Sequence, residues 1–153
     1  MNVPDVSECL AMDVPLKILI VDDDEVDRTM VRGALEASGL AAAFVEAGTG
    51  AAGLEALRSG PIDCALVEYR LPDTDGLSLL QAARSSGVTT PLIFLTGPGD
   101  EELAVELMRA GANDNLSKVR LSRDLLAHSV RHVVRLNRAQ AEAMQARADL
   151  LAR

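Results

Sequence analysis

Four short apolar runs along this chain each lead into a polar residue. Residues 17–21, 64–67, 91–95 and 112–117 read as strands, and the polar residues that end or follow them include Asp22, Glu68, Thr96 and Lys118. Apolar residues at helical spacing separate the runs, an alternation typical of βα units on a parallel sheet. Because parallel strands end at the same edge of an open sheet, we expect these four side chains to lie close together.

Helix signals between the strands complete this pattern. Four helices are predicted: one from Val26 that closes at Ser38-Gly39, one from about Thr49 to Arg58, one from Gly76 that closes at Ser86-Gly87, and one capped by Asp100 that ends at Gly111. In the last of these, Leu103, Leu107 and Met108 are expected to face inward. A weakly marked strand lies near residues 42–45. The predicted fold class is α/β, a doubly wound five-stranded parallel sheet (βα)5 in the flavodoxin-like order 2-1-3-4-5 with an extended C-terminal helix.

The C-terminal segment, residues 122–153, differs from the rest because it contains no Pro or Gly. A helix of about 30 residues is much longer than the usual 11 or 12, so we expect it to leave the domain. Residues spaced by three and four predict a coiled-coil seam and a homodimer: Ala127, Val130, Val134, Asn137, Ala141, Met144, Ala148 and Leu151. A chance stripe on an Ala-rich helix is the alternative. His128 and His132 lie one turn apart on this helix, and we interpret them as solvated surface residues.

Composition narrows the class of protein. Of the 153 residues, 48% are apolar and only 2% are aromatic, so the core is expected to be aliphatic. Residues 1–117 carry 20 acidic and 7 basic side chains, whereas residues 118–153 carry 3 and 8. The acidic part is a poor partner for nucleic acid and the basic part lacks an aromatic or base-reading pattern, so we predict no nucleic-acid partner. Residues 1–15 are expected to be a flexible leader without signal-peptide character. With no membrane span and no disulfide framework from Cys9 and Cys64, we expect a cytoplasmic protein.

The four polar strand ends and the turn Leu71-Pro72-Asp73-Thr74-Asp75-Gly76 together resemble the receiver domain of two-component response regulators. The resemblance covers most of residues 16–136 and implies a receiver-like domain over residues 16–121. It implies that Asp23 binds Mg²⁺ directly and Asp22 through water, with the backbone carbonyl of Arg70 and the acceptor position, Glu68, completing the metal site. Thr96 and Lys118 match the residues that contact the phosphoryl group. The implied partners are a sensor histidine kinase or a fused output module, and no enzymatic activity is expected.

Glu68 departs from the family pattern, because the family carries the phosphoacceptor aspartate there. The extra methylene displaces the carboxylate, so we expect no efficient phosphorylation and a weakened Mg²⁺ site. Three interpretations follow: Glu68 pairs with Lys118 and imitates the phosphorylated state, it locks the domain inert as a binding module, or it was introduced into a chain that naturally carries Asp.

Two further departures affect the implied switch. Val119 stands where the family usually has a proline preceded by a cis bond, and we predict a trans bond and an altered loop. Asn115 stands at the position of the switch aromatic, so the usual relay between that ring and the threonine is absent. Tyr69 is either a replacement for the ring or a surface residue.

Two rival functions also fit parts of the sequence. Asp22-Asp23-Asp24-Glu25-Val26 matches the first motif of haloacid-dehalogenase-type Mg²⁺ phosphatases, with Asp22 as nucleophile and Asp24 as acid–base, but the chain lacks their fourth, acidic motif. The other rival is a docking and dimerisation module that binds no ligand.

Overall fold

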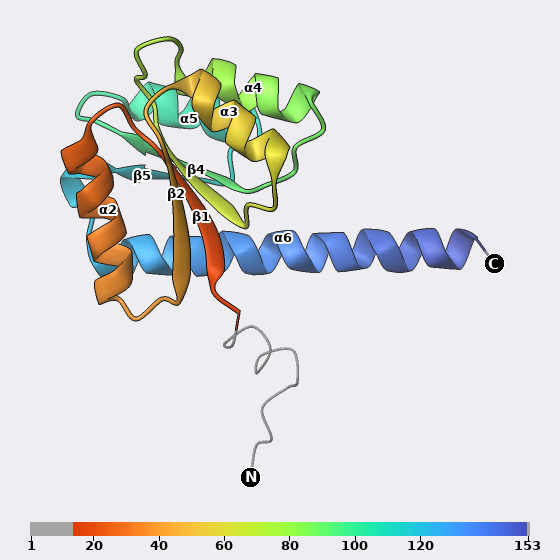
Figure 1. Ribbon diagram of the computed structural model, residues 1–153. Helices are drawn as coiled ribbons and strands as arrows, with labels where there is room; N and C mark the ends of the chain where they lie inside the picture. Colours follow the sequence, from red (N-terminus) through yellow and green to blue (C-terminus); the bar gives the residue numbers. More distant parts are fainter. Residues whose placement is uncertain (1–13, 153) are drawn as a thin grey trace.

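The computed structural model describes residues 14–152, and Figure 1 shows one twisted sheet between two layers of helices. All strand pairs are parallel, in the order β2-β1-β3-β4-β5. The strands are β1 (Leu16–Val21), β2 (Ala42–Ala47), β3 (Cys64–Glu68), β4 (Leu92–Thr96) and β5 (Asp114–Ser117). The predicted fold class and strand order are therefore confirmed. Most of the predicted leader, residues 1–13 with Cys9, lies outside the described residues.

Burial explains why some strands were easier to recognise in the sequence than others. The three central strands are covered by helices on both faces, so β3 and β4 are apolar at nearly every position. The edge strand β2 is half-exposed or exposed at every position except Ala47, which accounts for its weak apolar signal. The other edge strand, β5, has the sequence Asp-Asn-Leu-Ser and buries only Leu116.

Two hydrophobic cores lie on opposite faces of the sheet. One face packs against α3 (Gly50–Ser59), α4 (Gly76–Ser85) and α5 (Glu101–Arg109), and the other against α2 (Glu25–Ala37) and α6 (Arg123–Leu151). A short 3-10 helix, η1 (Lys118–Arg120), connects β5 to α6. The large fully buried side chains are almost all aliphatic, as predicted; Phe94 is the aromatic exception.

Side-chain caps fix where most helices begin. Thr49, Asp75 and Ser122 accept hydrogen bonds from backbone N–H groups in the first turns of α3, α4 and α6. Asp100 occupies the N-cap position of α5 as predicted, but its carboxylate makes no capping hydrogen bond and instead accepts hydrogen bonds from Gly97 N and Arg70 Nη2, both at 2.9 Å. Within α5, Leu107 is buried as predicted, but Met108 is 46% exposed, because it lies on the flank of the helix beside the inward-facing side.

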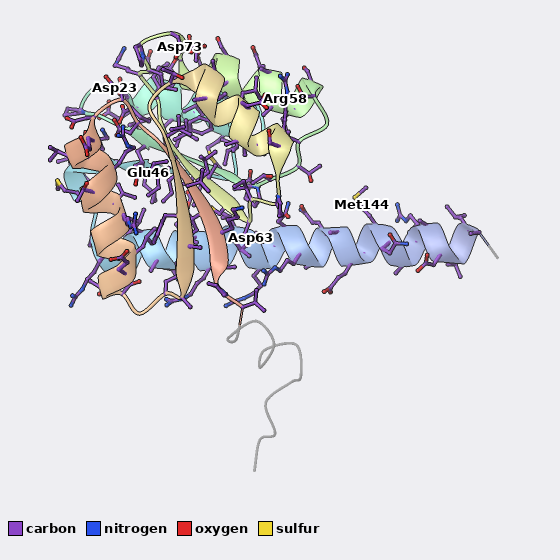
Figure 2. All side chains as sticks on the ribbon, viewed as in Figure 1. Asp23, Glu46, Arg58, Asp63, Asp73 and Met144 are labelled. Carbon is purple, nitrogen blue, oxygen red and sulfur yellow. The ribbon has the colours of Figure 1, made fainter. Side chains whose placement is uncertain are left out.

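The helix α6 has two parts with different surroundings. Its first half packs on the sheet, whereas the second half projects beyond the domain, and Figure 2 shows Met144 on this projecting part, directed into solvent. No helix between residues 14 and 152 is both long and apolar enough to cross a membrane. The prediction that the C-terminal helix extends beyond the domain is therefore confirmed.

The predicted coiled-coil seam must be corrected in its first half. Val130 and Val134 are 0% and 5% exposed and belong to the core between α6 and the sheet. Asn137 donates a hydrogen bond from Nδ2 to the backbone oxygen of Thr89 at 3.0 Å. These residues make contacts within their own domain and are not available to a second helix, because this face of α6 covers the sheet. The remaining seam residues, Ala141, Met144, Ala148 and Leu151, are exposed.

Candidate functional site

The carboxyl ends of β1, β3, β4 and β5 bring the four predicted side chains to one edge of the sheet. Asp22, directly after β1, and Thr96, at the end of β4, are each only 3% exposed. Glu68 at the end of β3 and Lys118 after β5 are partly buried, with side chains 12% and 32% exposed. Asp23 lies at the same edge and is exposed (Figure 2).

Lys118 is the centre of this cluster. Its Nζ forms an ion pair with Glu68 Oε2 and lies 3.4 Å from Asp27 Oδ2 and 3.7 Å from Asp22 Oδ2. Burial alone lowers the pKa of Lys118, but the hydrogen bond and charge of Glu68, with Asp22 and Asp27, outweigh it and raise the pKa above its ordinary value. The lysine therefore stays charged and neutralises part of an acidic pocket.

Burial has the opposite consequence for Asp22. It raises the pKa of this carboxyl, although the hydrogen bond from Asp24 N at 2.9 Å and the charge of Lys118 act to lower it. Asp24 itself caps α2 by accepting a hydrogen bond from Val26 N at 2.8 Å. An aspartate in that structural role is not positioned as the acid–base of a phosphatase, which weighs against that rival function.

The arrangement of these oxygens does not fit the Mg²⁺ site that the resemblance implies. Among residues 14–152, no group of three or more His, Cys, Asp or Glu side chains is placed to hold a metal ion. Glu68 turns toward the Lys118 ammonium, and its other oxygen lies 3.5 Å from the backbone N–H of Arg70. Because Mg²⁺ requires near-octahedral oxygen ligands at short range, a lysine bound to the central carboxylate competes with it.

Thr96 and Asn115 contact each other. Asn115 Nδ2 donates a hydrogen bond to Thr96 Oγ1 at 3.3 Å, while the buried Oδ1 of Asn115 has no hydrogen-bond partner in the described part of the chain. The threonine hydroxyl is thus engaged by the residue that replaces the switch aromatic. Tyr69 does not lie on the surface: it is 8% exposed and packs in the core with Phe94.

The loop after Lys118 has the predicted trans geometry. All peptide bonds between residues 14 and 152 are trans, including Lys118–Val119. Val119 lies in η1 and is 68% exposed, so its side chain makes no contribution to the pocket.

Sequence reasoning missed three side-chain contacts that shape the site. Asp27 lies on the first turn of α2 and faces Lys118, a position that its place in the helix directly after Asp22 and the cap Asp24 could have indicated. Asp73 accepts hydrogen bonds from Gly50 N at 2.8 Å and Ala51 N at 3.0 Å, which lowers its pKa and ties the loop after β3 to α3. The Arg70 side chain pairs with Asp100, joining that loop to the loop after β4. No local sequence signal marks this last contact.

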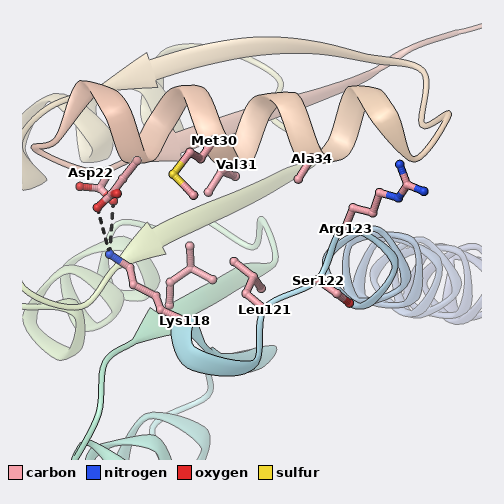
Figure 3. A pocket seen from close by; sticks show the side chains of 10 residues that line it. Asp22, Met30, Val31, Ala34, Lys118, Leu121, Ser122 and Arg123 are labelled. Atoms are coloured by element: carbon pink, nitrogen blue, oxygen red, sulfur yellow. Dashed lines mark hydrogen bonds and ion pairs between the residues drawn. The ribbon is translucent and has the colours of Figure 1, made fainter.

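A pocket of about 240 Å³ adjoins the acidic cluster, between α2 and the start of α6 (Figure 3). Asp22, Asp27 and Lys118 lie at one end of it, and apolar side chains such as Met30, Val31 and Leu121 form its walls. Because it shares these three charged residues with the cluster, the pocket is part of the same site.

Comparison with known proteins identifies the family. A family model described as the response regulator receiver domain matches residues 18–131. The chain belongs to this family. The transcriptional regulatory protein FixJ of Azorhizobium caulinodans is 37% identical over 112 residues, covering 67% of this chain and 48% of FixJ. The two-component response regulator ORR41 of Oryza sativa subsp. japonica is 31% identical over 105 residues, covering 67% of this chain and 83% of ORR41.

Solved structures agree with this membership. The crystal structure of FixJ-N matches with a TM-score of 0.72 and 26% identity, covering 80% of this chain and 95% of that one. The receiver domain of the Francisella response regulator 1452 matches with a TM-score of 0.70 and 27% identity, covering 78% and 97%. The chain spans about half the length of the FixJ protein that it matches, so the activity of such a whole regulator is not transferred to it.

Proposed function

We propose that this receiver domain is held in one phosphorylation-independent state by the ion pair between Glu68 and Lys118. In this state Glu68 takes the place of a phosphorylated aspartate as the anionic partner of the lysine. The signal then passes through α6, which is proposed to pair in a homodimer. The partners proposed are a sensor histidine kinase or an output module, in the cytoplasm.

The contact between Lys118 and Glu68 carries this proposal. A phosphoryl group on an aspartate would present its charge to this lysine from beyond the carboxylate, and the extra methylene of glutamate moves a carboxylate in the same direction. Because Glu68 is only 12% exposed, its attraction for the ammonium is weakly screened. The ion pair therefore persists without a phosphoryl donor.

The same geometry disfavours phosphoryl transfer to Glu68. A nucleophile displaced by about 1 Å can lose about a hundredfold in rate. The Glu68 oxygen that faces the pocket is also bound by Lys118 in place of the metal that would draw charge from the transferred group. For this reason Mg²⁺ has no role in the proposed state.

A docking module without any switch is the second candidate. It is favoured by the hydrogen bond between Asn115 and Thr96, because a threonine held by Asn115 does not reach toward Glu68. The two candidates differ in whether the pocket still responds when an aspartate is restored.

Intact mass after incubation with acetyl phosphate and Mg²⁺ tests the proposal. We expect no modification of this chain and one labile phosphoryl group on the Glu68→Asp variant, with Glu68→Gln as an unreactive control. If neither this chain nor Glu68→Asp is modified, the docking module is supported instead. Modification of this chain itself would contradict the role proposed for Glu68.

A further inference from the structure

We propose that the surface of α6 that pairs with a second copy of this chain is its outer stripe, and that the two helices run parallel. The outer stripe consists of His132, Leu136, Ala139, Ala143, Ala146 and Leu150. This inference rests on the proposed pairing of α6 and identifies the face and orientation that the pairing uses.

The face of α6 directed toward the sheet is not available along its whole length. Val130 and Val134 are buried in the core, and Asn137 binds the backbone of Thr89. At 3.6 residues per turn, Ala141 and Ala148 lie on the continuation of this same face. A helix placed there would run into the domain as it extended toward the N-terminus of α6.

The outer stripe lies about half a turn away from Val130, on the side of α6 that faces away from the domain. All six of its residues are exposed, with Leu136 at 50% and Leu150 at 69%. Their spacing of four, three, four, three and four residues is the repeat of a coiled-coil seam. Figure 1 shows the second half of α6 running straight beyond the sheet, which leaves this side of the projecting part open to a partner helix.

Charges beside the outer stripe favour a second copy in parallel orientation. In a parallel pair, the residue just before Leu136 or Ala143 contacts the residue five places later in the other helix. This rule places Glu142 against Arg147 of the second copy, and the two-fold symmetry produces the contact twice. Within residues 14–152 neither side chain forms an ion pair in its own chain. The preceding pair of flanking residues, Arg135 and Gln140, adds no repulsion.

The sequence of the stripe also suits a close helix pair. Ala139, Ala143 and Ala146 are small enough for two backbones to approach closely, and Leu136 and Leu150 contribute larger apolar contacts at the two ends. An unrelated partner would need its own matching charges, whereas two copies of this helix supply the Glu142 and Arg147 contacts from one sequence.

Cysteine cross-linking of the full chain tests the face and the orientation. In a Cys9→Ser, Cys64→Ala background, the single variants Ala139→Cys and Ala146→Cys are oxidised mildly and run under denaturing conditions. We expect each to form a disulfide with its own copy, because equivalent seam positions meet in a parallel pair. The matched controls Ala141→Cys and Ala148→Cys, on the sheet-facing side, are expected to form no disulfide and to run as single chains.

Charge reversal provides a second, independent readout. By sedimentation equilibrium, Glu142→Arg is expected to weaken the dimer about tenfold, since it turns two weak attractions into repulsions. The double variant Glu142→Arg, Arg147→Glu restores the attraction and is expected to regain the original affinity. Both residues lie on the exposed part of α6, so neither change affects the core.

Each other outcome overturns a defined part of the inference. Cross-linking at Ala141→Cys and Ala148→Cys instead would place the interface on the sheet-facing side. In an antiparallel pair the two alternating rows of the stripe meet each other, so cross-linking of Ala139→Cys only to Ala143→Cys, in a mixture of the two, would show that orientation. In both cases the proposed pairing of α6 stands and only its face or orientation fails. A monomer in the unmodified chain would remove the pairing itself, while the phosphorylation test of Glu68 remains valid.

Discussion

Lys118 Nζ binds the Glu68 carboxylate directly, whereas its separation from the nearest Asp22 oxygen is 3.7 Å. Lys118 and Glu68 follow β5 and end β3, which are not neighbours in the sheet because β4 lies between them. The ion pair therefore spans the carboxyl end of β4, the strand that ends at Thr96. This contact connects the carboxyl ends of β3 and β5, although no backbone hydrogen bonds join these two strands.

Lys118→Met is expected to lower the free energy of unfolding by about 1–3 kcal/mol, because Glu68 and Asp22 then remain in a partly buried pocket without their cation. Urea denaturation at neutral pH measures this. Adding Glu68→Gln to Lys118→Met removes one of the two stranded charges and is expected to recover much of the loss. An equal loss in the single and double variants would show that the lysine acts through its packing.

The pKa of Asp22 predicts a dependence of stability on pH. Burial raises this pKa in the folded state above its ordinary value of 3.8, so the folded state binds the proton more readily than the unfolded state. Asp22 therefore contributes stability that is fully present below about pH 3.8 and is lost as the pH rises through its folded pKa. Asp22→Asn is expected to stabilise the protein at pH 7 and to lose this advantage toward pH 3.8.

Denaturation curves of Asp22→Asn across this pH range provide the measurement, and Asp23→Asn is the matched control because Asp23 is exposed. The asparagine keeps an oxygen that can accept the hydrogen bond from Asp24 N. If Asp22→Asn destabilises the protein at pH 7, the attraction of Lys118 for the Asp22 carboxylate outweighs the effect of burial, and the predicted direction is wrong.

The contact between Thr96 and Asn115 leads to a non-additive prediction. Thr96→Val is expected to destabilise the protein by about 1 kcal/mol, since it leaves the Asn115 amide with neither of its groups paired. The double variant Thr96→Val, Asn115→Leu removes both polar groups and is expected to be as stable as the original protein or more so. A double-mutant cycle by chemical denaturation checks this coupling.

Much of the fold and of the site could be predicted from sequence because both depend on local patterns. The apolar runs of β1, β3 and β4 are continuous since helices cover these strands on both faces, and their carboxyl ends necessarily share one edge. The order of apolar runs and polar strand ends is therefore enough to bring Asp22, Glu68, Thr96 and Lys118 together. The trans bond at Val119 follows from the cost of a cis bond without proline.

The contacts that could not be predicted depend on tertiary geometry. Asp100 has the residue type and position of a helix cap, but Arg70, which is 30 positions away, and the backbone of Gly97 occupy its carboxylate. In α6, apolar residues at spacings of three and four occur on two sides of the helix. Only the position of the sheet shows that the side with Val130 belongs to the core.

Substitutions on these two sides of α6 should have different effects on folding. Val130→Ala is expected to lower the free energy of unfolding by about 1–3 kcal/mol, because it leaves a cavity in the core between α6 and the sheet. Met144→Ala, at a side chain that is 74% exposed, should have little effect. Denaturation at low and high protein concentration distinguishes a loss of packing in the core from a loss of contacts in a dimer. If Val130→Ala lowers the free energy of unfolding equally at both concentrations, Val130 stabilises the single domain. A loss of stability that appears only at high concentration would place Val130 in a dimer interface instead.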